Sequence, residues 1–286
     1  MNKHLILIVS TLLLLSGCGM GNTKTNKNEN HDKTGTVITS NEIINIHGNV
    51  KNLERLDEFV TNVSNQKSDE IRVTHYTIEG DPIYDEVVFN GKQLSITHDT
   101  TEDAFGSKER NSYTCQNIER TESKTDLEYM LLDCEADGQR GDTPLLSIEY
   151  NLSTQDYFAF RLEFGVDRKN IIDTKEMELT KDLQNGEMVT VSDFKFSNDE
   201  LQSIYKLMVL AGYLDEKKVS TSCQVKPLES YKLQVWINQG TREYEWNRCD
   251  NSADGKVMTQ LVDNMIEVLK KNHIYKELPE VKGHYE

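Results

Sequence analysis

The sequence predicts an α+β protein of two domains, each a mostly antiparallel sheet with one or two packed helices, after a leader and a flexible tether. Three observations support this fold class. Short segments that alternate apolar and polar residues follow one another without a helix between them, and only three segments have helical periodicity. The pattern also restarts near residue 151, and each half contains two of the cysteines. We therefore expect domains over residues 41–150 and 151–286.

The amino end has the composition of a signal peptide. A basic start with Lys3 precedes an apolar run over residues 5–15, which is interrupted only by Ser10 and Thr11. A permanent membrane span requires about 20 apolar residues, so this run is too short to be one. We predict that residues 1–17 are a signal peptide.

The segment Leu15-Ser16-Gly17-Cys18 resembles the lipobox of bacterial lipoproteins. This resemblance implies cleavage between Gly17 and Cys18, with a lipid attached to the Cys18 thiol, and hence attachment to the outer side of the cell membrane. A secreted protein with an unmodified cysteine is the alternative. Residues 18–40 are polar and bury too little apolar surface to fold, so we expect a flexible tether there.

The formal charge of the chain is −16, and most of the excess acidic residues lie in residues 37–150. An acidic surface repels phosphate groups, so we do not expect nucleic acid as a partner. Solubility at the cell surface is the simpler reason for this charge, and an acidic recognition face is the alternative.

In the first domain, one helix and about six strands are predicted. Apolar residues at helical spacing indicate a helix over about residues 50–64, after a cap at Gly48-Asn49: Leu53, Leu56, Val60 and Val63. Strands are expected over residues 71–78 and 83–89. The pair Asn90-Gly91 is typical of a type I′ turn, after which Leu94, Ile96 and His98 alternate on one face. Two strands that contain Cys115 and Cys134, and one over residues 144–150, complete the sheet.

The second domain begins with an alternating strand in the segment "DYFAFRLEFG", and weaker strands are expected over residues 174–179 and 187–194. Ser197 and Glu200 form a capping-box pattern before a helix that reaches Ala211. A hairpin is predicted to turn at Gln239-Gly240. The last helix is predicted over about residues 254–272, with its buried stripe at Val257, Leu261, Met265 and Val268.

Four cysteines remain beyond Cys18, an even number in a chain predicted to be exported. If the strands around a turn at residues 123–126 pair so that opposed residue numbers sum to 249, Cys115 faces Cys134 at a distance that permits a disulfide. A Cys223–Cys249 disulfide follows by elimination. Metal ligation is the alternative, but no C-x-x-C motif or histidine at ligand spacing supports it.

Other motifs are weak. The segment "DNSADG" at residues 250–255 resembles the start of a calcium loop, but position twelve is Leu261, so helix capping by Asp250 or Ser252 is favoured. The tripeptide Arg140-Gly141-Asp142 is expected in a polar turn. His75 and His98 lie on predicted strands and could approach each other, but structural histidines with satisfied hydrogen bonds are favoured. Trp236 and Trp246 are expected in the core or on a hairpin face, although Trp246 could also line a shallow groove. We predict no metal site, cofactor or catalytic residue.

Several segments resemble a family of lipoproteins from Bacillus-type bacteria that is classed as domain of unknown function 4362. They are the lipobox, the segments "NIHGNVKNLERLDEFV" and "YTIEGDPIYDEVVFNG", the two strands with Cys115 and Cys134, and the ending "KELPEVKGHYE". The resemblance is best over residues 41–150. It implies an envelope lipoprotein of Gram-positive bacteria and no known activity.

These observations favour a membrane-anchored, extracytoplasmic binding or interaction module. Its partners would be the membrane, through the lipid on Cys18, and an unidentified envelope protein or small ligand. A solute receptor linked to transport, an envelope enzyme acting on wall polymer, and a surface inhibitor or partner-binding protein are the alternatives. The consecutive strands disfavour the solute receptor, because such receptors usually alternate strands and helices around a cleft.

Overall fold

The computed structural model describes residues 30–31, 37–38, 41–136 and 138–285. The predicted signal peptide, its cleavage site at Gly17 and the lipidated Cys18 lie outside these residues. The chain divides into two units, residues 1–40 and 41–286. In the first unit, which includes the expected tether, β1 (Asn30–His31) pairs antiparallel with β2 (Val37–Ile38).

The second unit contains two sheets, so the α+β class is confirmed. Within the described residues, the first sheet has nine strands in the order β11-β10-β8-β7-β6-β5-β3-β4, with β9 paired to β10 beside this path. Adjacent strands in this sheet run antiparallel, except β3 and β5, which run parallel. The strands are β3 (Glu42–Ile46), β4 (Asn49–Lys51), β5 (Asp69–Tyr76), β6 (Pro82–Phe89), β7 (Leu94–Asp99), β8 (Arg110–Cys115), β9 (Asn117–Glu122), β10 (Asp126–Ala136) and β11 (Gln139–Glu149).

One helix, α1 (Leu53–Ser64), packs against β3, β5 and β9. Its predicted apolar face is confirmed, and Phe59 is also fully buried in it. The predicted cap at Gly48-Asn49 is wrong, because Gly48 lies in the turn between β3 and β4, with a φ of 86°, and Asn49 begins β4. The helix begins three residues later than predicted, after Asn52. The β3–β4 hairpin is too short to show an alternating pattern, which is why it was not predicted.

The predicted type I′ turn at Asn90-Gly91 is also wrong. Phe89 pairs with Leu94, so four residues connect β6 to β7. The Asn90 side chain accepts hydrogen bonds from the backbone N–H groups of Lys92 and Gln93, at 2.9 and 3.0 Å. Only Gly91 has the positive φ that a type I′ turn requires at both central residues. Local side-chain bonding to the backbone therefore selects a longer loop than the residue pair suggests.

The second sheet has six antiparallel strands within the described part of the chain, in the order β15-β14-β13-β12-β16-β17. The strands are β12 (Phe158–Val166), β13 (Asn170–Asp173), β14 (Glu178–Asp182), β15 (Met188–Ser192), β16 (Glu229–Ile237) and β17 (Gly240–Asn247). Residues 174–177 connect β13 to β14, so the strand predicted at 174–179 begins too early. A 3-10 turn, η1 (Leu152–Thr154), precedes β12.

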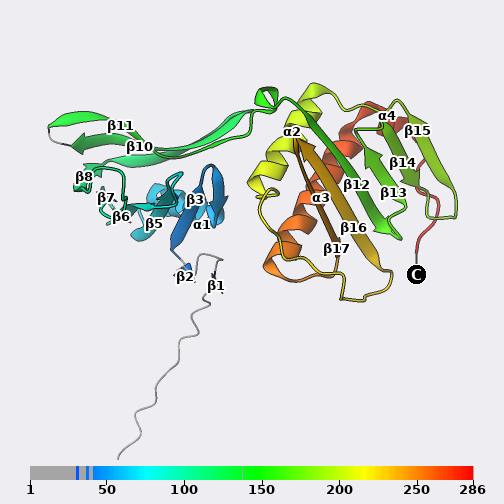
Figure 1. Ribbon diagram of the computed structural model, residues 1–286, viewed down its shortest axis with the longest axis horizontal. Helices are drawn as coiled ribbons and strands as arrows, with labels where there is room; N and C mark the ends of the chain where they lie inside the picture. Colours follow the sequence, from blue (N-terminus) through cyan, green and yellow to red (C-terminus); the bar gives the residue numbers. More distant parts are fainter. Residues whose placement is uncertain (1–29, 32–36, 39–40, 137, 286) are drawn as a thin grey trace, which may run out of the picture. The chain divides into compact units, whose positions relative to one another are not determined.

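Figure 1 shows α2 (Asn198–Leu210) and α3 (Ala253–Lys271) beside this sheet, followed by the short α4 (His273–Glu277). The capping box of α2 is confirmed, since the side chains of Ser197 and Glu200 each bond to the other residue's backbone N–H. The predicted stripe of α3 is right except at Val257, and Val268 is partly buried against the core. Leu261 and Met265 are buried, whereas Val257 is 42% exposed and Met258 takes its place in the core.

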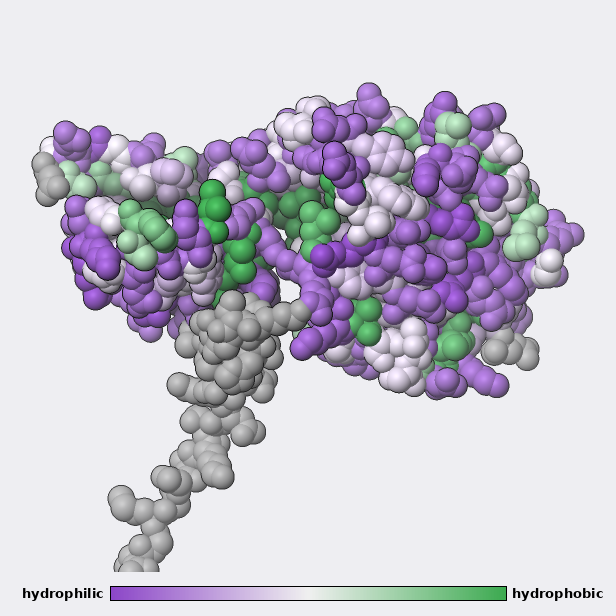
Figure 2. Space-filling model, viewed as in Figure 1, coloured by the Kyte–Doolittle hydropathy of each residue, from purple (hydrophilic) through white to green (hydrophobic). Residues whose placement is uncertain are grey.

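Each sheet has its own cluster of buried hydrophobic residues, but the two clusters share the helix α2. Tyr205 packs in the cluster of the first sheet, and Ile204 and Met208 pack in that of the second. The face in Figure 2 is mostly hydrophilic, with hydrophobic residues scattered over it. The two sheets with separate cores agree with two domains, although that division itself stays a prediction.

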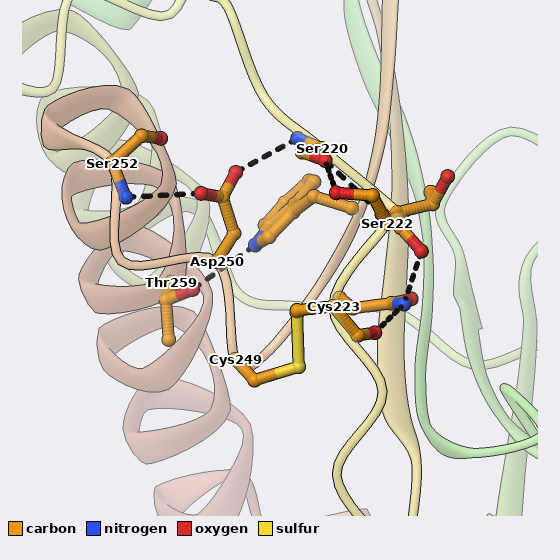
Figure 3. Close-up of a disulfide and its surroundings, with 10 residues drawn as sticks. Ser220, Ser222, Cys223, Cys249, Asp250, Ser252 and Thr259 are labelled. Atoms are coloured by element: carbon orange, nitrogen blue, oxygen red, sulfur yellow. Dashed lines mark hydrogen bonds between the residues drawn. A yellow bond between two sulfur atoms is a disulfide. The ribbon is translucent and has the colours of Figure 1, made fainter.

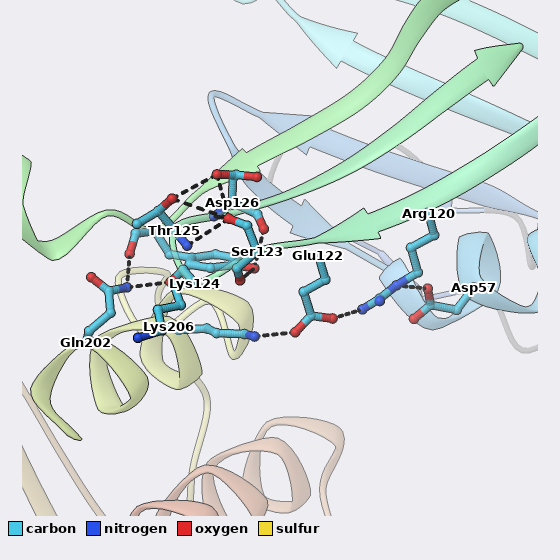
Figure 4. Close-up of polar contacts among 10 residues, drawn as sticks. Asp57, Arg120, Glu122, Ser123, Lys124, Thr125, Asp126, Gln202 and Lys206 are labelled. Carbon is cyan, nitrogen blue, oxygen red and sulfur yellow. Dashed lines mark hydrogen bonds and ion pairs between the residues drawn. The ribbon is translucent and has the colours of Figure 1, made fainter. Parts of the chain in front are cut away.

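Polar side chains also connect α2 to the first sheet (Figure 4). Arg120 lies between Asp57 and Glu122, at 2.9 and 2.6 Å, and Glu122 forms an ion pair with Lys206 of α2. The bond from Lys206 holds the pKa of Glu122 below its usual range. The Gln202 amide donates to two backbone carbonyls of the first sheet and accepts from the N–H of Leu152. These contacts hold α2 against the end of the β9–β10 hairpin.

Candidate functional site: an open polar groove on the first sheet

Both predicted disulfides are present, Cys115–Cys134 and Cys223–Cys249. The predicted register of the first pair is confirmed, since Thr114 pairs with Glu135 and the β9–β10 pairs continue the same alignment. The turn is also where it was expected, with the N–H of Ser123 donating to the carbonyl of Asp126. This disulfide fixes the end of β10 against β8, beside an open groove.

The groove has a volume of about 490 Å³ and lies on the same face of the sheet as the buried core. Helix α1 packs over β3, β5 and β9 and leaves this part of the face uncovered. The groove is lined from β6, β7 and β8 on one side and from β10 and β11 on the other. Its lining residues are Asp85, His98, Asn111, Tyr113, Cys134, Ala136, Gln139, Arg140, Gly141, Asp142, Thr143 and Pro144.

A row of polar side chains crosses the sheet at this position. Strand pairing sets His98 directly opposite both Asp85 and Asn111. The Asp85 carboxylate lies 2.7 Å from Nδ1 of His98 and 3.4 Å from Nε2 of His75. Asn45 lies 3.1 Å from Nδ1 of His75. Asp85 therefore joins the two histidines, His75 and His98, whose strands could bring them together.

Hydrogen bonding assigns a proton to each imidazole in this row. The N–H of Gly48 donates to Oδ1 of Asn45 at 2.8 Å, which turns the Asn45 amide nitrogen toward Nδ1 of His75. Nδ1 of His75 is thus an acceptor, and its Nε2–H faces Asp85. The other oxygen of Asp85 accepts from Nδ1–H of His98.

In the tautomer that donates Nδ1–H to Asp85, Nε2 of His98 is a hydrogen-bond acceptor on a ring that lines the groove. Asp85 is only 9% exposed, so its two imidazole contacts hold the carboxylate and the His98 ring in one orientation. The row thus presents a fixed acceptor to any molecule that enters the groove.

Tyr113 lies half-buried in the groove. Burial, and then the negative charge of Asp85, raise the pKa of Tyr113 to about 12. Its hydroxyl is therefore protonated at neutral pH and can donate or accept one hydrogen bond. A ring beside a polar row is common in sites that recognise small molecules.

The tripeptide Arg140-Gly141-Asp142 is part of strand β11, so the prediction of a polar turn there is wrong. Arg140 lies 3.3 Å from Glu135, and Oδ1 of Asp142 accepts from the N–H of Asp133 at 3.0 Å. Both charged side chains thus bond within the hairpin, unlike those of a protruding recognition loop. The prediction failed because the irregular β10–β11 pairing, with two register shifts, hides the alternation of the strand.

Histidine and carboxylate side chains in the described residues form no group of three that is placed to hold a metal ion. The row from Asn45 to His98 is therefore best described as a hydrogen-bonded network. Sequence reasoning found its histidines but missed Asp85. The pairing of residues 85 and 98 across the β6–β7 hairpin would have indicated it, but only with the correct loop length.

The calcium-like segment serves to begin α3 (Figure 3). Asp250 accepts from the N–H groups of Ser220 and Ser252, at 2.7 and 3.0 Å, and Ser252 accepts from the N–H of Gly255 at 3.0 Å. Capping by Ser252 is confirmed. Gly255 is required there, because a Cβ atom would lie 2.4 Å from the Asp250 carboxyl carbon.

Trp246 is fully buried, so the prediction that it belongs to the core is confirmed over the shallow-groove alternative. Its ring centroid lies 5.1 Å from that of Tyr231, and its Nε1–H donates to Thr259 at 3.0 Å. Trp236 is only partly buried and lies under Nζ of Lys175, 4.9 Å from its ring centroid.

By its fold the protein is an α+β protein of two largely antiparallel sheets, with an open polar groove on the first. Residues 40–130 match a family model described as "Domain of unknown function (DUF4362)". This match confirms the resemblance to that family and includes α1, Asp85 and His98. Neither a curated protein nor a solved structure gives a significant match. Within the described part of the chain, the helices lack the length and apolar character needed to cross a membrane.

Proposed function

We propose that the protein is a membrane-anchored, extracytoplasmic lipoprotein that acts as a binding module, with the groove beside His98 as its ligand site. The observation that carries this proposal is the fixed polar row, Asn45–His75–Asp85–His98, at an open part of the sheet face. Burying a carboxylate costs free energy that lowers the stability of the fold. Ionisable side chains held together in a cleft often mark binding sites.

Binding is better supported than catalysis for this groove. Asp85 orients His98 as carboxylates orient catalytic imidazoles, but the sulfur of Cys134 is held in a disulfide. The hydroxyl groups that line the groove belong to Tyr113, whose pKa is raised, and to Thr143. Neither is bonded to His98, which an activated nucleophile would require.

The replacement His98→Ala tests the site. We expect ligands found by a thermal-shift screen of the full chain to raise the melting temperature of the wild type but not of this variant. A ligand at 100 times its Kd stabilises the native state by about 2.7 kcal/mol. The matched control is Thr97→Ala, because Thr97 is the preceding residue and bonds to Ser112 away from the groove. Equal shifts in both variants would place the ligand elsewhere.

The anchor is tested at Cys18. We expect Cys18→Ala to abolish labelling of the protein by a radioactive fatty acid and to release the protein from sedimented membranes. Two acyl chains on one residue hold a protein firmly at a membrane, and this variant would carry none. Cys223→Ala with Cys249→Ala is the control, since it also removes cysteines, here a disulfide pair, but leaves position 18 intact. Unchanged sedimentation of Cys18→Ala would contradict the lipoprotein part of the proposal.

A further inference from the structure

Two hydrogen-bond acceptors of the groove belong to opposed residues of β7 and β8. In the tautomer of His98 that donates Nδ1–H to Asp85, Nε2 is an acceptor. Asn111, directly opposite His98, donates one amide N–H to Glu109 at 3.3 Å, and its Oδ1 is available as an acceptor. Opposed residues on adjacent strands have Cβ atoms about 5 Å apart, so one small group can contact both acceptors.

The charge around these acceptors is negative. Asp85 and Asp142 carry carboxylates, and Arg140, the one Lys or Arg among the described residues that line the groove, lies beside Glu135. The groove is therefore complementary to a cation with several hydrogen-bond donors. A planar guanidinium binds best to both oxygens of one carboxylate, but both oxygens of Asp85 contact imidazole rings. A compact ammonium group fits these acceptors better.

We propose that the groove binds its ligand through a protonated amine, whose N–H groups donate to Nε2 of His98 and Oδ1 of Asn111 above the Asp85 carboxylate. The Tyr113 ring flanks the amine and its stem. An ammonium group has three donors and no acceptor, which matches this set. The inference rests on the proposed function and adds the chemical class of the ligand to it.

Such an amine can come from a free polyamine or from a lysine side chain on a polypeptide. Calorimetric titration of the full chain in detergent micelles distinguishes these sources with two probes, spermidine and N-acetyl-lysine methylamide. The fully acetylated form of each probe keeps the same carbon chain but carries no charge, because an amide nitrogen is not protonated at neutral pH. We expect at least one charged probe to bind, and its acetylated form to bind at least tenfold more weakly. The probe that binds identifies the source.

Two variants show whether the binding occurs at this groove. We expect Asn111→Leu and His98→Ala each to lower the affinity for the charged probe at least tenfold. Ser112→Ala, on the opposite face of β8, is expected to leave this affinity unchanged. Equal affinity for charged and acetylated probes, with loss in both groove variants, would overturn the ammonium inference and leave the binding function standing. If salt abolishes the binding but neither groove variant changes it, the probe is attracted to the acidic surface in general, and the ammonium inference is overturned.

Absence of binding by both charged probes would also overturn the ammonium inference. The thermal-shift screen then tests the binding function separately.

Discussion

Replacement of Trp246 by alanine is expected to lower the free energy of unfolding by about 3–5 kcal/mol, the usual loss when a fully buried aromatic side chain is removed. Trp246 has no exposed surface and packs on Tyr231 in the core of the second sheet. Its removal also leaves Thr259 without its indole partner. Urea unfolding followed by far-UV circular dichroism measures the loss.

Trp236→Ala is the matched control, since it removes the same side chain from a partly buried position on the other face of β16. We expect it to cost clearly less than Trp246→Ala. Equal losses would contradict the placement of the second core, and a larger loss for Trp236 would mean that β16 packs through its opposite face.

The second large effect is expected from the disulfide beside the groove. Replacing both Cys115 and Cys134 by alanine is expected to destabilise the protein by about 3 kcal/mol, because the open chain gains the conformational freedom of a loop that joins residues 19 positions apart. Since Cys134 lines the groove, the same variant is also expected to weaken ligand binding at His98.

Replacing Cys223 and Cys249 instead gives the comparison. This pair joins residues 26 positions apart in the second half, so a similar loss of stability is expected, but without an effect on the groove. If the two halves are separate domains, each pair of replacements lowers the midpoint of a different unfolding transition. Loss of groove binding in the Cys223/Cys249 variant would contradict this assignment.

Local signals in the sequence identified much of this fold. The capping box at Ser197 and Glu200 predicts α2 because both partners lie within one turn, and the register of Cys115 with Cys134 follows from the position of one turn. Errors arose where longer-range contacts decide the structure. Gly48 belongs to a hairpin whose first strand, β3, pairs with β5, and α3 turns Met258 rather than Val257 into the core.

The site was harder to predict than the fold. Asp85 is one acidic residue among 48, and it differs from the others only because β5 and β7 bring two imidazoles to its carboxylate. The open groove also depends on how much of the sheet α1 covers, which no local pattern reports. The histidines could be singled out because they are few, whereas their common partner required the strand pairing.

The fold explains why a polar row can persist on the face that carries the hydrophobic core. Val87 and Phe89 of strand β6 point into the hydrophobic core. Asp85 lies two residues before Val87, on the same face of the sheet but outside the core. Alternation keeps all three side chains on one side of the sheet. The site is therefore an extension of the core face, held rigid by strands on both sides.

The most direct test of the central claim is whether the groove is occupied in the cell. A photo-reactive benzophenone amino acid at position 143, on the groove lining, is expected to give a covalent adduct that mass spectrometry of the purified chain detects, whether the ligand is small or a protein. The same amino acid at position 112, on the opposite face of β8, is expected to give none. Adducts of equal yield at both positions, or at 112 alone, would contradict the account.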